Sequence, residues 1–121
     1  MLPQEFRLKS NKDIEKVFKN GKTVRSSFLF LKFAPNDSDS QQSKIAFSIG
    51  LRYSKKAVKR NRAKRVLREA AKNFLKDIKP GYSLVFFLDK NFSQDLNLEE
   101  VKTQMSKTLS TAGLLESNHR H

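Results

Sequence analysis

Three stretches of the chain carry apolar patterns that predict β-strands. Residues 22–34 form one predicted strand, whose part 28–33 is rich in strand formers and too apolar for a strand with one face in water, and residues 82–88, YSLVFFL, form another. Residues 44–51 instead alternate with period two, which predicts one core face and one open face. The core face holds Ile45, Phe47, Ile49 and Leu51, and the open face holds Ala46, Ser48, Gly50 and Arg52. Small side chains on the open face leave room for either a ligand or a covering helix.

The stretch 22–34 divides its side chains between two faces. One face carries Phe28, Phe30 and Lys32, and the other carries Leu29, Leu31 and Phe33. A lysine among aromatic rings predicts that the first face is only partly buried.

Helical spacing of apolar residues predicts three helices, over residues 11–20, about 54–77 and 97 to about 111. The expected end signals are Ser10 with Asp13 and then Gly21 for the first helix, Pro80-Gly81 after the second, and Asn97 with Glu100 and then Gly113 for the third. Residues 1–9 are expected to be extended, 35–43 to form an exposed turn, and 116–121 to be a disordered tail. We therefore predict one domain over residues 1–115.

The second helix combines an apolar face with a dense cationic face. Residues 52–72 hold ten basic side chains and a single acid, Glu69. The apolar positions are Ala63, Val66, Leu67, Ala70, Ala71, Phe74 and Ile78; the row Arg60, Lys64, Arg68 and Lys72, with Asn61 and Arg65 beside it, lies about 120° away around the helix. Like charges at this spacing destabilise a helix, and arginine forks fit phosphate well. The pattern indicates a helix that binds a polyanion rather than a merely solvated face.

Charge and composition extend this interpretation to the whole chain. The 121 residues carry 25 basic and 12 acidic side chains, a net charge of +13, which favours DNA, RNA or an anionic membrane as partner. There is no apolar run of the ~20 residues that a membrane span needs, and no signal-peptide pattern is expected. Cysteine is absent, which is consistent with a reducing cytoplasm.

Catalytic machinery is missing from the pattern of reactive residues. The two histidines, His119 and His121, both lie in the expected tail, and the four glycines stand apart rather than in a phosphate loop. The acids are scattered, so neither a metal nuclease site nor a Ser/His/acid set is indicated. We expect no active site built from protein residues alone.

The segment AVKRNRAKRVLR, residues 57–68, resembles the signature of the protein subunit of bacterial ribonuclease P. The likeness extends over most of residues 5–90 in order and spacing. Its further elements are Phe6-Arg7-Leu8, Asp13, Val17-Phe18, Gly21 and the strand Ile45 to Gly50. Three positions depart from the family pattern: Leu51 and Arg52 stand where two lysines are usual, and Ile14 stands where an aromatic residue is common.

The resemblance implies a two-layer α/β sandwich of the α+β class, like the second domain of ribosomal protein S5. Its order is α-β-β-β-α-β-α, so residues 22–25 would form a short first strand. The connection through the basic helix would be left-handed, against the usual rule for such units.

The resemblance also implies a function. In that family the protein binds a large catalytic RNA, and this RNA with its magnesium ions cleaves the 5′ leader from precursor tRNA. The protein would then be part of a cytoplasmic endonuclease, with no catalytic residue, metal site or cofactor of its own and with no membrane or small-molecule partner. RNA-binding positions would be Arg52, Lys56, Lys59, Arg60, Asn61, Arg62, Lys64, Arg65 and Arg68. A cleft for the leader would be lined by Ile14, Phe18, Phe30, Lys32, Ser48 and Lys90, with Arg52 beside them.

Two other classes of function remain open at the level of sequence. A structural RNA-binding protein of ribosomal type would use the same basic helix without any role in cleavage. A duplex-DNA reader is possible for any basic helix, although no helix-turn-helix spacing or dimerisation signal is present.

Overall fold

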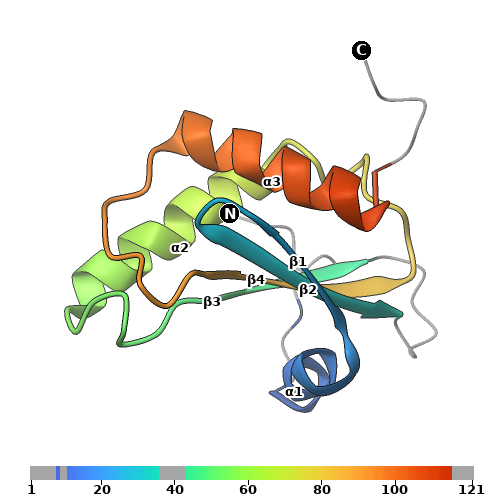
Figure 1. Cartoon of the computed structure of the whole chain (residues 1–121), viewed down its shortest axis with the longest axis horizontal. Helices are drawn as coiled ribbons and strands as arrows, with labels where there is room; N and C mark the ends of the chain where they lie inside the picture. The colour runs from blue at the N-terminus through green and yellow to red at the C-terminus, as the bar shows by residue number, and fades with distance from the viewer. Residues whose placement is uncertain (1–7, 9–10, 36–42, 116–121) are drawn as a thin grey trace.

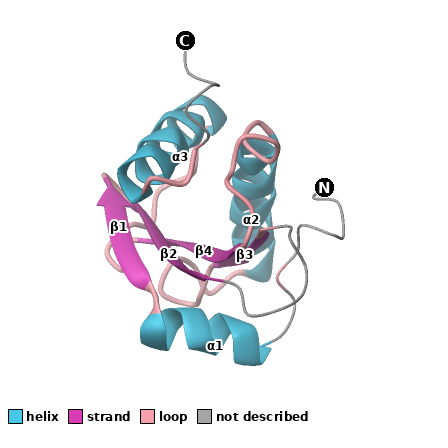
Figure 2. Cartoon of the chain, turned by 90° about the vertical axis from the view of Figure 1, so that its right-hand side faces the viewer, coloured by secondary structure: helices cyan, strands magenta, loops and turns pink. Residues whose placement is uncertain are grey.

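The protein consists of one four-stranded sheet with helices on both faces (Figure 1). This computed structural model describes residue 8 and residues 11–35 and 43–115. The elements are α1 (Asn11–Asn20), β1 (Lys22–Ser26), β2 (Leu29–Pro35), β3 (Lys44–Ser48), α2 (Ala57–Lys72), β4 (Tyr82–Leu88) and α3 (Leu98–Ala112). Helices α2 and α3 cover one face of the sheet, and α1 lies alone against the other (Figure 2).

The strand order is β1-β2-β4-β3, which confirms the predicted α+β class and its element order. The pairs β1/β2 and β2/β4 are antiparallel, whereas β3 and β4 are parallel neighbours joined through α2. Followed from β3 up through α2 and down to β4, the chain turns left-handed (Figure 2), as the resemblance implies. The connection places the N-terminal end of α2 beside the carboxyl ends of β3 and β4.

The main core lies between the sheet and the pair α2/α3. Alternate residues of β2 and β4 are fully buried there, and they meet the apolar faces predicted for the two helices. The central members are Leu29, Leu31, Leu84, Phe86, Leu67, Met105 and Leu109, none of which has measurable exposure. Helix α2 is anchored through Ala63, Leu67, Ala70 and Ala71, so its cationic side chains lie off the core face, with Arg62 and Arg65 exposed and Arg60, Lys64 and Arg68 half-buried.

Helix α1 buries only part of the opposite face. Val85 of β4 is fully buried in a second cluster with Val17 and Leu8, and the Leu8 N–H donates to the Ile45 carbonyl at 2.9 Å. Two residues further along β4, on the same face, Phe87 is only half-buried. The face is therefore covered by α1 at one end and open beyond it. The prediction of a covering helix is confirmed at the Ala46 end, and the prediction of room for a ligand at the other end stays a prediction.

Several element boundaries differ from the expectations. The stretch 22–34 is two strands, joined by a two-residue turn in which Ser27 has φ 55°. Phe28 leaves the face of Phe30 and packs against the α2/α3 core, where its ring stacks on Phe92 at 4.7 Å. Strand β3 ends at Ser48, so Leu51 is not a core residue but is 67% exposed.

The expected turn at 35–43 is also corrected at its ends. Pro35 closes β2, and Ser43 is buried, donating to the Lys79 carbonyl and accepting from the Tyr82 N–H. Helix α2 spans 57–72 rather than 54–77, because the residues that follow form turns rather than continued helix. The expectations for residues 1–7, Ser10, the middle of the 35–43 turn and the 116–121 tail lie outside the described residues.

The geometry of the helix ends tests the predicted cap Asn97 and the predicted stop residues Gly113 and Gly21. Asn97 caps α3 by accepting from the Glu100 N–H at 3.1 Å, and Gly113 ends that helix with φ 74°, both as predicted. Gly21 does follow α1, but without a left-handed φ. A Cβ at Gly21 would meet the Phe33 carbonyl oxygen at 2.9 Å, so close approach of two backbones explains this glycine.

Candidate RNA-binding surfaces

A row of four residues crosses the open end of the sheet, one from each strand. Arg25 pairs with Phe30, Phe30 with Phe87, and Phe87 with Ser48 in the strand register. Directly opposite residues point to the same face, so this row lies on the α1 side of the sheet. We call the face formed by Arg25, Phe30, Phe87 and Ser48 the sheet groove.

The aromatic rings of the sheet groove contact one another. Phe30 and Phe87 stack with ring centres 5.2 Å apart, and Phe18 from α1 meets Phe87 at 5.4 Å with a tilt of 51°. The Arg25 guanidinium carbon lies 4.9 Å from the centre of the Phe30 ring. Helix α1 thus forms a wall, and the sheet forms an aromatic floor with a cation at its far edge.

Lys32 ties the wall to the floor. Its ammonium donates to the Phe18 carbonyl at 2.7 Å and lies 5.5 Å from the centre of the Phe18 ring. The Phe18 carbonyl lies in the last turn of α1, where a cation also complements the helix dipole. Lys32 is thereby held, half-buried, at the junction of α1 and β2, with its ammonium against the end of α1.

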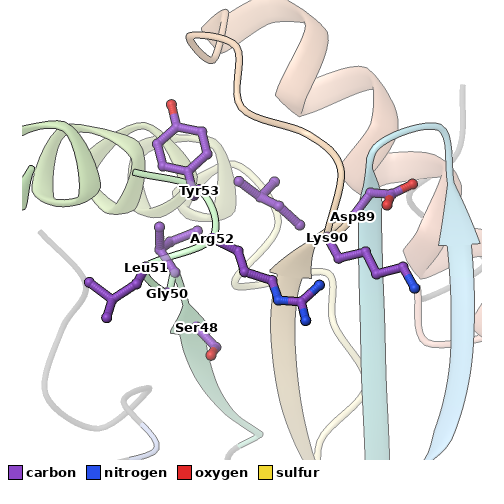
Figure 3. A pocket seen from close by; sticks show the side chains of 9 residues that line it. Ser48, Gly50, Leu51, Arg52, Tyr53, Asp89 and Lys90 are labelled. Atoms are coloured by element: carbon purple, nitrogen blue, oxygen red, sulfur yellow. The ribbon is translucent and has the colours of Figure 1, made fainter. Parts of the chain in front are cut away.

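A pocket of about 360 Å³ continues the groove at the carboxyl ends of β3 and β4 (Figure 3). Its lining includes Ser48, Gly50, Leu51, Arg52 and Lys90. Figure 3 shows the side chains of Arg52 and Lys90 extending to the same side, whereas the Tyr53 hydroxyl points away. Two cations at the mouth of an open pocket favour an anionic ligand.

The carboxylate and the phenol beside this pocket have partners of their own. Asp89 accepts from the Arg25 guanidinium at 2.7 Å, and the Tyr53 hydroxyl donates to the Gln94 carbonyl at 3.0 Å. Burial raises the pKa of Tyr53 above its usual value; the negative charge of Asp95 raises it further, and Arg62 opposes the shift. Asp89 is therefore engaged at the sheet edge by Arg25, and among the described residues no carboxylate lies within ion-pair distance of Arg52 or Lys90.

The second candidate surface is the outer face of α2. Among the described residues, no carboxylate lies within ion-pair distance of Arg60, Arg62, Lys64, Arg65 or Arg68. Exceptions occur at the edges of the helix, where Lys59 pairs with Asp95 at 3.6 Å and Lys72 with Glu69 at 3.2 Å. One arginine also braces the fold, since the Arg60 guanidinium donates to the Ser54 carbonyl at 2.9 Å. The rest of the strip is cationic and uncompensated.

The structure divides the predicted site residues between these two surfaces. Phe18, Phe30, Lys32, Ser48 and Lys90 come together at the groove and its pocket, and Arg52 joins them there rather than α2. Lys56 precedes α2 as its N-terminal boundary residue, and Lys59, Arg60, Asn61, Arg62, Lys64, Arg65 and Arg68 all lie on that helix. Ile14 packs into the cluster around Val85, so it supports α1 from beneath.

Two groove residues were not predicted from the sequence, Phe87 and Arg25. Phe87 lies in the uniformly apolar stretch 82–88, in which no alternation marks an open face. Phe87 lies two residues after Val85, so the two side chains share one face of the strand. The sequence does not show that α1 is long enough to cover Val85 but too short to cover Phe87. The pairing of Arg25 with Phe30 could not be predicted, because the turn between β1 and β2 contains none of the residues that usually mark a turn.

The described part of the chain contains neither a candidate metal site nor a candidate membrane span. Within it, no group of three or more His, Cys, Asp or Glu side chains could hold a metal ion. In the same residues, every helix is too short or too polar to span a membrane.

Together, the open aromatic face of the sheet and the arginine-rich helix on a left-handed α+β scaffold are the features of a nucleic-acid-binding protein. A family model described as ribonuclease P matches residues 2–113, so the chain belongs to the ribonuclease P protein family. It is similar to the ribonuclease P protein component of Synechocystis sp., with 31% identity over 98% of this chain and 94% of the relative, and to that of Pseudanabaena sp., with 32% identity over 98% and 100%.

Solved structures agree with the fold. A ribonuclease P protein from Staphylococcus aureus superposes with a TM-score of 0.78 at 20% identity, covering 92% of this chain and 98% of that one. One from Thermotoga maritima gives 0.75 at 23% identity, covering 87% and 96%. Family membership makes the chain the RNA-binding protein component of a tRNA-processing ribonucleoprotein, part of an endoribonuclease holoenzyme. A purely structural role of ribosomal type is not favoured.

Proposed function

We propose that α2 binds the catalytic RNA of ribonuclease P and that the sheet groove holds the 5′ leader of precursor tRNA. The observation that carries this proposal is the separation of two unlike surfaces on one rigid core. One presents a row of cations along a helix, most of them without a carboxylate partner, and the other presents stacked rings with Arg25, itself paired with Asp89, at one end and Arg52 and Lys90 near the other. Each surface suits a different form of RNA.

The face of α2 suits the backbone of a folded RNA. Phosphates spaced along an RNA helix can be met by cations spaced along a protein helix, and arginine binds them through two parallel hydrogen bonds. Arg65 and Arg68 are supported by a helix that buries Leu67 and Ala71 in the core. Their positions are therefore fixed before binding, which lowers the entropy lost on contact.

The groove suits a single strand without sequence preference. Base stacking on aromatic side chains contributes about 1–3 kcal/mol per base, and every base can supply it. Phe30 and Phe87 provide such a platform, with Arg25 at one end of the row and Arg52 and Lys90 near the other. A leader of any sequence could lie across these strands with phosphates near the cations.

The chemistry of cleavage is assigned in this proposal to the RNA and its magnesium ions. The protein contributes binding: α2 holds the catalytic RNA, and the groove positions the leader so that the scissile bond lies at the RNA active site. Such work takes place where tRNA is made, so we place the protein in the cytoplasm.

The experiment that tests the proposal is cleavage of precursor tRNA by this protein with and without a bacterial ribonuclease P RNA. We expect activity at physiological magnesium only when both are present. A second measurement compares the affinity of the holoenzyme for precursor and mature tRNA, where we expect tighter binding of the precursor. Cleavage by the protein alone, or equal affinities, would contradict the proposal.

A further inference from the structure

The loop that follows β3 has two features that the packing of the protein does not explain. The first is a glycine with no structural need to be one. A Cβ added to Gly50 would meet nothing within 4 Å, and its φ lies outside the left-handed region. Alanine would therefore fit the fold, and the missing side chain leaves open space in the pocket wall.

The second feature is an exposed apolar side chain at the same place. Leu51 is 67% exposed although it lines the pocket that holds Arg52 and Lys90. Figure 3 shows Leu51 extending from the loop in the direction opposite to Arg52, with Gly50 beside them. An apolar side chain gains nothing from a phosphate, but it can pack against the face of a nucleobase.

We propose that Gly50 and Leu51 direct the path of the leader as it leaves the sheet groove. The strand crosses over Gly50 with a phosphate between Arg52 and Lys90, and the adjoining base packs on Leu51. This inference rests on the proposed function, and it adds a residue that contacts a base rather than a phosphate. It assigns the pocket to one nucleotide of a single strand, because a base inside a duplex is stacked on both faces and has none free for Leu51.

The chain offers a matched control for Leu51. Val58 is the other exposed large apolar residue among those described, at 70%, but it lies on the first turn of α2 and does not line the pocket. Truncation of either side chain removes a similar exposed apolar surface. Only Leu51→Ala should change how affinity depends on the leader.

The test measures affinity of the holoenzyme for precursor tRNAs with leaders of increasing length. We expect Leu51→Ala to weaken binding of long-leader substrate by about fivefold, a loss typical of one partly buried apolar contact, and to leave mature tRNA unchanged. Val58→Ala should leave the ratio of the two affinities at the wild-type value. Equal effects of the two variants on that ratio would overturn the inference.

Two further variants separate the path from the stability of the fold. Gly50→Ala should keep or raise the melting temperature, since it fits the backbone and restricts the unfolded chain, yet weaken long-leader binding. Leu51→Lys should steepen the salt dependence by about 0.7 in the log–log slope, the value for one added phosphate contact on a single strand.

If Gly50→Ala binds long leaders normally, the path over Gly50 is wrong. Should Phe30 and Phe87 variants lose leader preference while Gly50 and Leu51 variants keep it, only this inference fails and the groove stands.

Discussion

Phe30 and Phe87 are directly opposite one another on adjacent antiparallel strands, and their rings stack with an angle of 18° between the planes. Phe87 lies two residues after Val85 on the same face of β4, and Val85 is completely buried beneath α1. The sheet is thus a core surface at one end and an open aromatic surface at the other. This change occurs within a single strand because α1 is only ten residues long.

Phe87→Ala should reduce the preference of the holoenzyme for precursor over mature tRNA. Loss of one stacking platform is worth about 1–3 kcal/mol, which is roughly 5- to 150-fold in affinity for the long-leader substrate. The measurement is equilibrium binding of both tRNAs. Phe47→Ala is the control, because Phe47 stacks on Phe86 on the opposite face of the sheet. A fall in leader preference with Phe47→Ala as large as with Phe87→Ala would contradict the assignment.

Arg65→Ala should weaken binding of the catalytic RNA and flatten its salt dependence. Each lost phosphate contact lowers the slope of log affinity against log salt by about one unit. Lys107→Ala supplies the control, since Lys107 is an exposed cation on α3, away from the strip. Filter binding at four or more salt concentrations gives the slopes. An unchanged slope for Arg65→Ala would remove α2 from the interface.

Arg60→Ala should combine two effects. It removes a cation from the strip and also the hydrogen bond to the Ser54 carbonyl that braces the loop before α2. We therefore expect a lower salt slope together with a loss of about 1 kcal/mol in the free energy of unfolding. Urea unfolding beside the binding titration separates the two. A slope change without any loss of stability would show that the brace contributes nothing.

Asn97→Ala should destabilise the fold without touching either RNA surface. The Asn97 side chain accepts from the Glu100 N–H at 3.1 Å, and losing such a cap costs about 1 kcal/mol. Urea unfolding measures the change, and Asn97→Asp, which retains an acceptor, should restore most of the stability. Weaker RNA binding at temperatures where the variant is fully folded would be inconsistent with this role.

Tyr53→Phe should alter how stability depends on pH. The pKa of Tyr53 is raised in the folded state, mainly by burial and then by Asp95, so the unfolded chain loses its proton first as pH rises through about 10. Wild-type stability should therefore fall above that pH more steeply than that of the variant, which lacks the titrating group. At pH 8 the variant should be less stable by about 1 kcal/mol, since it loses the bond to the Gln94 carbonyl. A stability difference that stays constant from pH 8 to 11 would contradict this account.

The sequence predicted α2 well because its signals are local. Helical spacing of Leu67, Ala70 and Ala71 identified the buried face, and the same spacing placed Lys64 and Arg68 off that face, where both are half-buried. The helix cap at Asn97 was equally local. Such patterns depend on neighbours within one or two turns, so they survive without knowledge of the rest of the fold.

The parts that failed depend on contacts between distant segments. The turn at Ser27 and Phe28 contains no glycine, proline or asparagine, and the side chain of Phe28 is placed by Phe92, far along the chain. Leu51 continued an alternating pattern, but β3 had already ended when the chain turned toward α2. The opening at Phe87 is set by where α1 stops covering the sheet, which periodicity within β4 cannot reveal.

Site-specific crosslinking in the assembled holoenzyme tests the separation of the two RNA surfaces most directly. A photoreactive group placed at Ser48 of the groove, or at Lys64 of α2, would report which RNA lies against each. We predict that Ser48 reacts with the leader of bound precursor tRNA and that Lys64 reacts with the catalytic RNA. Reaction of both positions with the same RNA, or of Ser48 with the catalytic RNA alone, would contradict the account.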